Sequence, residues 1–462
     1  MNKAFFWVIL LFSTISLHAQ EITGSWEGVL EIQNTHLRII FHIEKKDTTF
    51  TTTMDSPDQG AFGLPVTRSS FQENKLEIIA AGLGLFYRGT LENDSITGTF
   101  TQGGISFPLV LKRAGEPLIQ RPQTPVEPLP YISEEVIISN PDKSFSLAGT
   151  LTLPDTTGVF PSVLLISGSG PNDRDETLFG HKPFFVISDY LTRNGFAVLR
   201  YDKRGVGKST GDYDKATIHD FADDARMAVN YLKHRKEIDV TKIGLLGHSE
   251  GGIIAPIVAS EEKGIHMMVL MAAPATTGIE VVLDQNEISM KQQGMEPETI
   301  GKLQMLNRDM FESLLVWDGT ENDRTALRDK LLQLWEQLPI LLKMKMKKEP
   351  YLRSQFNAMI KPGYRSFLAV DPAAYLEKVS CGVFAIHGEN DVQVPAEKNI
   401  NAIKKALEKG RNHRLETKIY PGLNHLFQES MTGQVDEYAK ITQTMSPVVL
   451  SDITNWLQRQ AE

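Results

Sequence analysis

One short motif, Gly247-His248-Ser249-Glu250-Gly251, constrains the fold of this chain more than any other stretch. It follows the apolar run 243–246 and precedes a predicted helix, so it joins a buried strand to a helix. Such a turn is so tight that side chains at its flanking positions would collide, which explains the glycines. It would hold the Ser249 hydroxyl clear of a sheet, beside the backbone N–H groups at a helix start. Taken alone, the motif also fits an unreactive glycine-rich loop.

The length and composition are those of a globular protein with more than one domain. The 462 residues allow two or three domains, and 41% hydrophobic with 23% charged residues is ordinary for packed domains. A formal net charge of −9 argues against a nucleic-acid-binding protein, which would carry a basic patch. Cys381 is the only cysteine, so an intramolecular disulfide is excluded.

Residues 1–19 have the pattern of a signal peptide. Lys3 precedes a mainly apolar run over 4–17, and the small residue Ala19 marks a plausible cleavage point. The run is too short to span a bilayer, which takes about 20 residues. We therefore expect export to the periplasm or the medium, cleavage near Ala19, and no stable membrane anchor afterwards.

Two segments with different compositions follow the signal peptide. Residues 20–114 are rich in Thr, Val, Ile and Phe between turn-forming residues, which predicts a small all-β, barrel-like domain. Its aromatic residues Trp26, Phe86 and Tyr87 could hold a ligand, but core packing is the favoured interpretation. Residues 115–131 contain five prolines, which favours an extended linker and a domain boundary.

Residues 132–462 alternate between short apolar runs and helical stretches. Runs such as 163–167, 197–201 and 242–246 suit the buried strands of a parallel sheet, with antiparallel strands at its start. This pattern predicts a doubly wound α/β domain. Residues 275–372 carry helical periodicity only and interrupt the alternation. A helical insertion there would form a cap above the carboxyl ends of the strands, where open α/β folds bind ligands.

An acid and a histidine follow two later predicted strands. Asp391 lies in the segment His387-Gly388-Glu389-Asn390-Asp391, directly after one strand, and Glu389 is its local rival. His425 lies in a loop after the last predicted strand. A serine nucleophile needs a base and an orienting acid, and the order Ser249, Asp391, His425 supplies both at the same sheet edge.

These motifs together resemble the α/β-hydrolase family. Gly247-x-Ser249-x-Gly251 resembles its nucleophile elbow, Gly388-x-x-Asp391 its acid loop, and Asn424-His425 its histidine loop. The resemblance covers roughly 132–462. It implies that Ser249 is the nucleophile, His425 the general base and Asp391 the acid that orients it.

The same resemblance implies an oxyanion hole made of two backbone N–H groups. The first would belong to Glu250, after the nucleophile. The second belongs to the loop after the strand at 163–167, where Ser167-Gly168 replaces the family's usual His-Gly pair. By position Ser169 is the favoured donor, with Gly170 as the alternative. The charged residues at 172–175 are interpreted as a loop anchor held by salt bridges.

The sequence favours a hydrolase of small acyl esters that works through an acyl-serine, without a metal or other cofactor and without a nucleic-acid partner. The alternative is a serine peptidase or aminopeptidase of the same fold. The β domain is far too short for the propeller of prolyl oligopeptidases. An aminopeptidase would need acidic residues in the cap to hold a substrate ammonium, and three are available: Glu280, Asp284 and Glu287.

Overall fold

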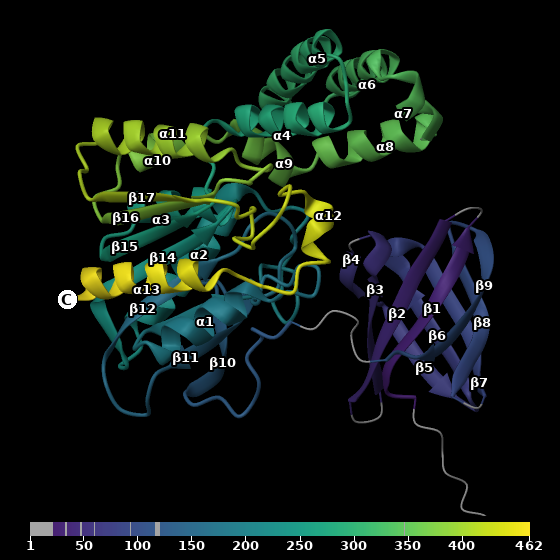
Figure 1. Ribbon diagram of the computed structural model, residues 1–462, viewed down its shortest axis with the longest axis horizontal. Coiled ribbons are helices and arrows are strands. Elements are labelled where there is room, and N and C mark those ends of the chain that lie inside the picture. Colours follow the sequence, from purple (N-terminus) through teal and green to yellow (C-terminus); the bar gives the residue numbers. More distant parts are fainter. Residues whose placement is uncertain are drawn as a thin grey trace, which may run out of the picture. The chain divides into compact units, whose positions relative to one another are not determined.

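The chain divides into two compact units, Met1–Leu118 and Ile119–Glu462. The structure, a computed structural model, describes residues 22–32, 35–46, 49–59, 61–92, 94–115, 121–345 and 347–462 (Figure 1). The predicted signal peptide at 1–19 lies outside the described residues. No helix within these ranges is long and apolar enough to cross a membrane.

The first unit is an antiparallel β-barrel (Figure 1). Its sheet order is β2-β1-β9-β8-β7-β6-β5-β3-β4, and an additional pairing of β2 with β3 closes the ring. Trp26 and Tyr87 are fully buried in its core, as the core-packing interpretation expects, but Phe86 is only half-buried and lies under the Arg88 guanidinium. The strands are β1 (Gly24–Ile32), β2 (Thr35–Lys46), β3 (Thr49–Ser56), β4 (Ala61–Pro65), β5 (Arg68–Gln72), β6 (Lys75–Ala80), β7 (Leu85–Glu92), β8 (Ser95–Gln102) and β9 (Ile105–Arg113).

The second unit is built on an eight-stranded sheet of order β10-β11-β13-β12-β14-β15-β16-β17. The first two strands pair antiparallel and the other six run parallel to one another. The parallel strands end at one edge of the sheet, so the loops that follow them come together there. The strands are β10 (Ile132–Ser139), β11 (Ser146–Leu153), β12 (Phe160–Ile166), β13 (Ala197–Tyr201), β14 (Ile238–His248), β15 (Ile265–Met271), β16 (Gly382–Gly388) and β17 (Leu415–Tyr420).

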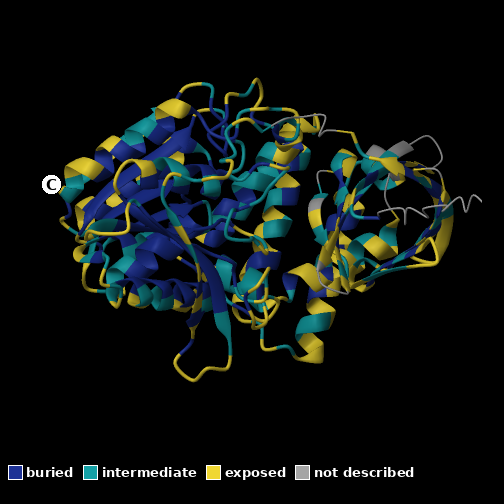
Figure 2. Ribbon diagram, turned by 90° about the horizontal axis from the view of Figure 1, so that it is seen from below, coloured by how far each residue is buried: buried dark blue, intermediate teal, exposed yellow. Residues whose placement is uncertain are grey.

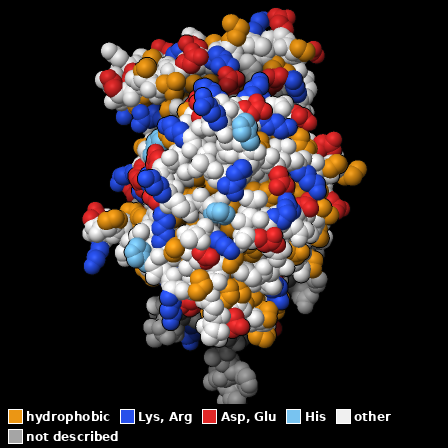
Figure 3. All heavy atoms as spheres, turned by 90° about the vertical axis from the view of Figure 1, so that its left-hand side faces the viewer, with side chains coloured by type: hydrophobic (Ala, Val, Ile, Leu, Met, Phe, Trp, Pro, Cys, Tyr) orange, Lys and Arg blue, Asp and Glu red, His pale blue; other side chains and the backbone are white. Residues whose placement is uncertain are grey.

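Helices cover both faces of this sheet, because its strands are apolar on both sides. Leu164 and Leu245 belong to the core on one face, while Val163 and Leu246 belong to the core on the other. Figure 2 shows the strands of this unit buried along most of their length. On the face shown in Figure 3, basic and acidic side chains are interspersed. The covering helices are α1 (Pro183–Arg193), α2 (Ile218–Lys233), α3 (Gly251–Glu261), α10 (Pro372–Leu376), α11 (Ala396–Lys409) and α13 (Pro447–Ala461).

A helical insertion interrupts the alternation between β15 and β16, as the sequence predicts. It has an apolar core of its own, formed by residues such as Leu303, Phe311 and Leu331. The predicted α/β arrangement with a helical cap, preceded by a small all-β domain, is thus confirmed. The cap helices are α4 (Gly278–Gln292), α5 (Pro297–Leu315), α6 (Glu321–Gln337), α7 (Ile340–Lys345), α8 (Lys348–Met359) and α9 (Pro362–Ala369); a short helix, α12 (Val435–Tyr438), follows β17 (Figure 1).

Part of the proline-rich segment packs onto the second unit instead of spanning free space. The Arg121 guanidinium donates hydrogen bonds to the carbonyl oxygens of Phe179 and Ala439 at 2.9 and 3.0 Å. The Tyr131 hydroxyl donates to Asp189 on α1 at 2.9 Å. Residues 121–131 therefore belong structurally to the second unit, although the composition of 115–131 suggests a linker throughout.

Candidate active site

Ser249 lies in a tight turn between β14 and α3. Its φ of +52° places a non-glycine residue in the left-handed region, which costs energy and is held by the surrounding structure. The Ser249 N–H donates to the carbonyl oxygen of Met271 on the neighbouring strand at 2.9 Å. Ser249 lines a cavity of this unit. The turn therefore presents the hydroxyl to a space that a substrate can enter.

The two glycines of the motif are required by close backbone contacts. A Cβ at Gly247 would lie 2.1 Å from the carbonyl oxygen of Gly251. A Cβ at Gly251 would lie 2.0 Å from the carbonyl oxygen of Ile166 on β12. Since real side chains never approach backbone atoms this closely, the start of α3 can lie against the sheet only if both residues are glycine.

Asp391 and His425 form a buried pair beside this turn. His425 Nδ1 donates to Asp391 Oδ2 at 2.7 Å. The other oxygen of Asp391 accepts the backbone N–H groups of Gln393 and Val394, both at 2.8 Å. Burial raises the pKa of Asp391, but the charge and the hydrogen bond of His425 outweigh it, so the pKa lies below its usual value. An ionised Asp391 can hold His425 in one orientation and tautomer.

The two other titratable groups on this loop do not contact His425. Glu389 accepts the backbone N–H of Gly422 at 3.1 Å instead. His387 is fully buried, and burial lowers the pKa of this histidine to about 4. His387 is therefore neutral near pH 7, and Asp391 is the acid that lies against His425.

In the loop after β12, both backbone polar groups of Gly168 are held by hydrogen bonds from or to side chains. The Gly168 N–H donates to Glu176 Oε1 at 2.6 Å, and its carbonyl oxygen accepts from Lys203 Nζ at 2.5 Å. The next residue, Ser169, lines the cavity together with Glu250. Among the described residues, no acceptor takes the backbone N–H of either Ser169 or Glu250. Both N–H groups are thus available to a ligand.

A buried ion pair joins this loop to the residue after Ser249. Lys203 Nζ lies 2.8 Å from Glu250 Oε1, and the two side chains are only 4% and 12% exposed. The same ammonium group lies 4.8 Å from the centre of the Phe221 ring. Lys203 therefore connects the loop of Gly168 to Glu250. One candidate oxyanion donor, Ser169, lies in that loop, and the other is Glu250 itself.

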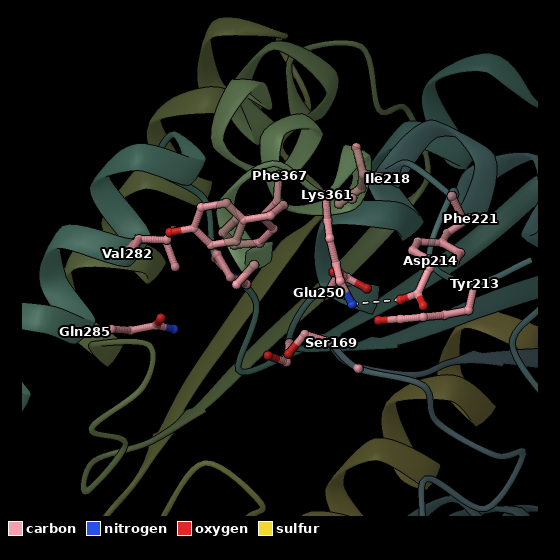
Figure 4. A pocket seen from close by; sticks show the side chains of 18 of the residues that line it. Ser169, Tyr213, Asp214, Ile218, Phe221, Glu250, Val282, Gln285, Lys361 and Phe367 are labelled. Atoms are coloured by element: carbon pink, nitrogen blue, oxygen red, sulfur yellow. Dashed lines mark hydrogen bonds and ion pairs between the residues drawn. The ribbon is translucent and has the colours of Figure 1, made fainter. Parts of the chain in front are cut away.

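The cavity above Ser249 has a volume of about 410 Å³ and lies between the sheet loops and the cap. Val282, Gln285 and Phe367 enter it from the cap, opposite Ser169 on the sheet side (Figure 4). Lys361 also reaches in from the cap and pairs with Asp214 at 2.8 Å (Figure 4). The lining is therefore largely apolar, and its charged members, Glu250, Asp214 and Lys361, belong to two lysine–carboxylate pairs.

The acidic cap residues considered for an aminopeptidase lie elsewhere. Glu280, Asp284 and Glu287 do not line the cavity. Each is paired with a cation of this chain: Glu280 with Arg308 at 2.7 Å, Asp284 with Lys398 at 2.5 Å, and Glu287 with Lys291 at 2.6 Å.

Two family models match the second unit, each over less than half of the chain. Residues 184–330 match the serine aminopeptidase S33 family, and residues 338–446 match the prolyl oligopeptidase family. The esterase EstD of Thermotoga maritima is 29% identical over 350 residues, which are 75% of this chain and 74% of EstD. The chain is an α/β-hydrolase. EstD, which matches most of the chain, is an esterase.

Two further proteins are similar to this α/β-hydrolase. The bifunctional esterase/perhydrolase DCH of Acinetobacter calcoaceticus is 24% identical over 269 residues, which are 55% of this chain and 87% of DCH. A solved structure of a Pyrococcus furiosus esterase has 16% sequence identity and a TM-score of 0.44, and the match covers 75% of this chain and 98% of that one.

Sequence reasoning about this α/β-hydrolase missed three residues that surround the site. Glu176, His248 and Lys203 are buried, and their side chains contact the loops that carry the catalytic candidates. His248 was visible as the residue before Ser249. Glu176 lies 72 residues from His248, so no local pattern joins the two. The anchoring role inferred for 172–175 fits the pairing of Arg174 with Asp202 at 2.9 Å.

Proposed function

We propose that this protein is an exported serine hydrolase that cleaves carboxylic esters through an acyl-serine intermediate. Ser249 is the nucleophile, His425 the general base and Asp391 the residue that orients His425. The observation that carries this assignment is the buried 2.7 Å hydrogen bond between His425 and Asp391, on loops that follow β17 and β16, beside the turn that holds Ser249.

The steps of the reaction follow from the chemistry of these groups. His425 takes the proton of Ser249 as the hydroxyl oxygen attacks the ester carbonyl, and ionised Asp391 stabilises the resulting imidazolium. The unpartnered N–H groups of Glu250 and Ser169 bind the negative oxygen of the tetrahedral intermediate. His425 then gives its proton to the leaving alcohol. Water, activated by His425, hydrolyses the acyl-serine.

The charges around the cavity favour an ester over an aminoacyl substrate. A site that binds a substrate ammonium needs a carboxylate free to pair with it. The two carboxylates of the cavity, Glu250 and Asp214, are already paired with Lys203 and Lys361. The similarity to EstD, an esterase, supports the same choice. The two peptidase family models keep a serine peptidase as the second candidate.

The apolar part of the cavity lining suits the acyl group. Val282 and Phe367 from the cap and Val394 from the sheet side offer hydrocarbon and aromatic surface. A cavity of about 410 Å³ lies at the lower end of the range for small-molecule sites. We infer that the substrate is a small ester with an apolar acyl group.

Replacement of the nucleophile tests the mechanism. Ser249→Ala should lower kcat for a p-nitrophenyl ester by at least about 10³-fold, since it removes the covalent step. A fluorophosphonate probe should label the wild type and not the variant. The folded state of the variant is checked by circular dichroism. Undiminished turnover by folded Ser249→Ala would contradict the proposal.

The choice between ester and peptide bonds needs matched substrates. We expect kcat/KM for p-nitrophenyl acyl esters to exceed that for aminoacyl p-nitroanilides by several orders of magnitude, after correction for uncatalysed hydrolysis. Faster cleavage of the anilides would favour the peptidase.

Export is tested separately, by cell fractionation and by mass spectrometry of the mature N-terminus. A start near Gln20 in the periplasm or medium would support it. An uncleaved chain in the cytoplasm would contradict it.

A further inference from the structure

A second buried histidine–carboxylate pair lies beside Asp391 and His425. His248 Nδ1 lies 3.0 Å from Glu176 Oε1, and His248 Nε2 lies 3.1 Å from the backbone carbonyl oxygen of His425. The rings of His248 and His425 are 4.9 Å apart, centre to centre. His248 is 6% exposed and Glu176 is 4% exposed. The pair is thus shielded from solvent and touches the candidate base.

The partners of His248 determine its protonation state. A neutral imidazole has one N–H donor and one bare nitrogen, whereas an imidazolium has two donors. Both partners of His248, a carboxylate oxygen and a carbonyl oxygen, can only accept. Both contacts are hydrogen bonds only if both ring nitrogens carry protons. Burial lowers the pKa of His248, but the charge and the hydrogen bond of Glu176, the carbonyl oxygen of His425 and the charge of Asp391 together outweigh burial and raise the pKa above its usual value.

Glu176 connects this pair to the oxyanion loop. The same oxygen that faces His248 also accepts the N–H of Gly168, the residue before Ser169. Glu176 itself has a left-handed backbone, with φ +52°, and its N–H donates to the carbonyl oxygen of Asp173 at 3.0 Å. The Asp173 side chain accepts the N–H of Thr177 at 2.9 Å. The loop is therefore folded so that the carboxylate of Glu176 points inward.

We propose that Glu176 and His248 are positioning residues, an ion pair that holds the oxyanion loop at Gly168 and the backbone of His425 in register with Ser249. This inference rests on the proposed function, because register matters only if these groups act together. Neither residue touches the substrate. The pair acts through the second oxyanion donor, Ser169, and through the placement of the base.

The proposal has a consequence at high pH. Because the pKa of His248 is raised in the folded protein, the ion pair is complete below that pKa and is lost as the pH rises through it. The charged groups that face His248 are Glu176 from the loop after β12, Asp391 from the loop after β16 and His425 from the loop after β17. The two carboxylates favour the protonated ring, and burial opposes them. Activity should therefore fall on the alkaline side when His248 loses its proton.

The test is the pH profile of Glu176→Gln. Glutamine keeps an oxygen for the Gly168 N–H but removes the charge that favours the His248 imidazolium. We expect kcat near pH 7 to fall about tenfold, with KM changed less than twofold, since a loosened oxyanion hole weakens the transition state more than the ground state. The alkaline limb of the kcat profile should move to lower pH by about one unit or more.

The matched control is Glu262→Gln, which removes a surface carboxylate paired with Lys233. It should leave the profile unchanged. A Glu176→Gln profile that matches the wild type after scaling would overturn the proposal, because a merely structural loss would lower kcat without moving the limb.

The protonation state can also be measured in the wild type. In protein labelled with ¹⁵N-histidine, both ring nitrogens of His248 should carry protons at pH 7, with the resonances assigned from a His248→Gln sample. A bare nitrogen at pH 7 would overturn the proposal even if Glu176→Gln did not fold.

Failure of this inference is distinguishable from failure of the proposed function. Labelling of Ser249 by a fluorophosphonate, together with an unshifted Glu176→Gln profile, would reject the ion pair alone. Turnover by Ser249→Ala would reject the proposed function, while the nuclear magnetic resonance result would still report on His248.

Discussion

His425 and Asp391 are 34 residues apart in the chain, yet Nδ1 of the first lies 2.7 Å from Oδ2 of the second. The parallel order of β16 and β17 brings this about, because both strands end at the same edge and each continues into one of the two loops. Two backbone N–H groups donate hydrogen bonds to the other carboxylate oxygen of Asp391. These bonds fix the orientation of the carboxylate toward the His425 imidazole.

Asp391→Asn should lower kcat for a p-nitrophenyl ester by about 10⁴-fold, because an amide favours the wrong tautomer of His425. The measurement is steady-state hydrolysis at pH 7. The matched control is Glu389→Gln on the same loop, whose carboxylate contacts Gly422 and not His425. It should keep kcat within about twofold. An equal loss in both variants would mean that the loop, and not the acid, is what matters.

Lys203→Met should lower kcat/KM by about 10²-fold, because it leaves the Glu250 carboxylate without its cation and removes one of the two side-chain donors, Lys203 and Asn172, to the carbonyl oxygen of Gly168. Lys208→Met removes an exposed lysine a few residues along, which is paired with Glu135 on the surface, and should have little effect. Both rates are measured on protein shown to be folded by circular dichroism. Wild-type turnover by Lys203→Met would show that the ion pair does not support the oxyanion donors.

Gly251→Ala should lower the free energy of unfolding by about 3 kcal/mol, since its Cβ would overlap the carbonyl oxygen of Ile166. Gly301→Ala is the control, and it should change the free energy of unfolding in the opposite direction. It lies within α5 with open space around its Cα, and alanine should stabilise the helix by about 1 kcal/mol. Denaturant titration followed by circular dichroism measures both. Equal stability of Gly251→Ala and the wild type would contradict the packing of α3 against β12.

Val282→Phe should reduce kcat/KM for a p-nitrophenyl octanoate about tenfold relative to the acetate, because the ring fills the apolar part of the cavity. Val316→Phe adds the same ring at a position that is 81% exposed and outside the cavity. That control should leave the ratio unchanged. A proportional loss on both esters in Val282→Phe would indicate general damage rather than a shorter acyl site.

The parts of the site that could be predicted are those with local signatures. The glycines around Ser249 belong to a short motif, although only Gly247 is required by a contact within that motif, whereas Gly251 is required by Ile166 on β12. The acid and the histidine each follow a buried strand, and parallel strands place such loops at a common edge. Trp26 could be assigned to a core because aromatic side chains bury a large apolar area, whereas Phe86, on the other face of its strand, is only half-buried.

Contacts between loops that are distant in the sequence have no local sequence motif that could predict them. Glu176 contacts His248 because its backbone is left-handed and because its N–H is bonded to Asp173. Neither feature produces a periodic pattern of residues in the sequence. Lys203 appears in the sequence as one basic residue among several in a turn. The prolines of 115–131 suggested a spacer, but Arg121 finds backbone carbonyls on the second unit, which composition alone does not encode.

The cap has a consequence for how this enzyme could diversify. The residues that face the substrate from the cap, including Val282, Lys361 and Phe367, come from one uninterrupted stretch between β15 and β16. The groups assigned to the chemistry all lie outside it, on loops at the sheet edge. Natural variation or laboratory recombination confined to this stretch could change which esters are accepted without disturbing bond cleavage, so substrate range and catalytic competence can evolve independently.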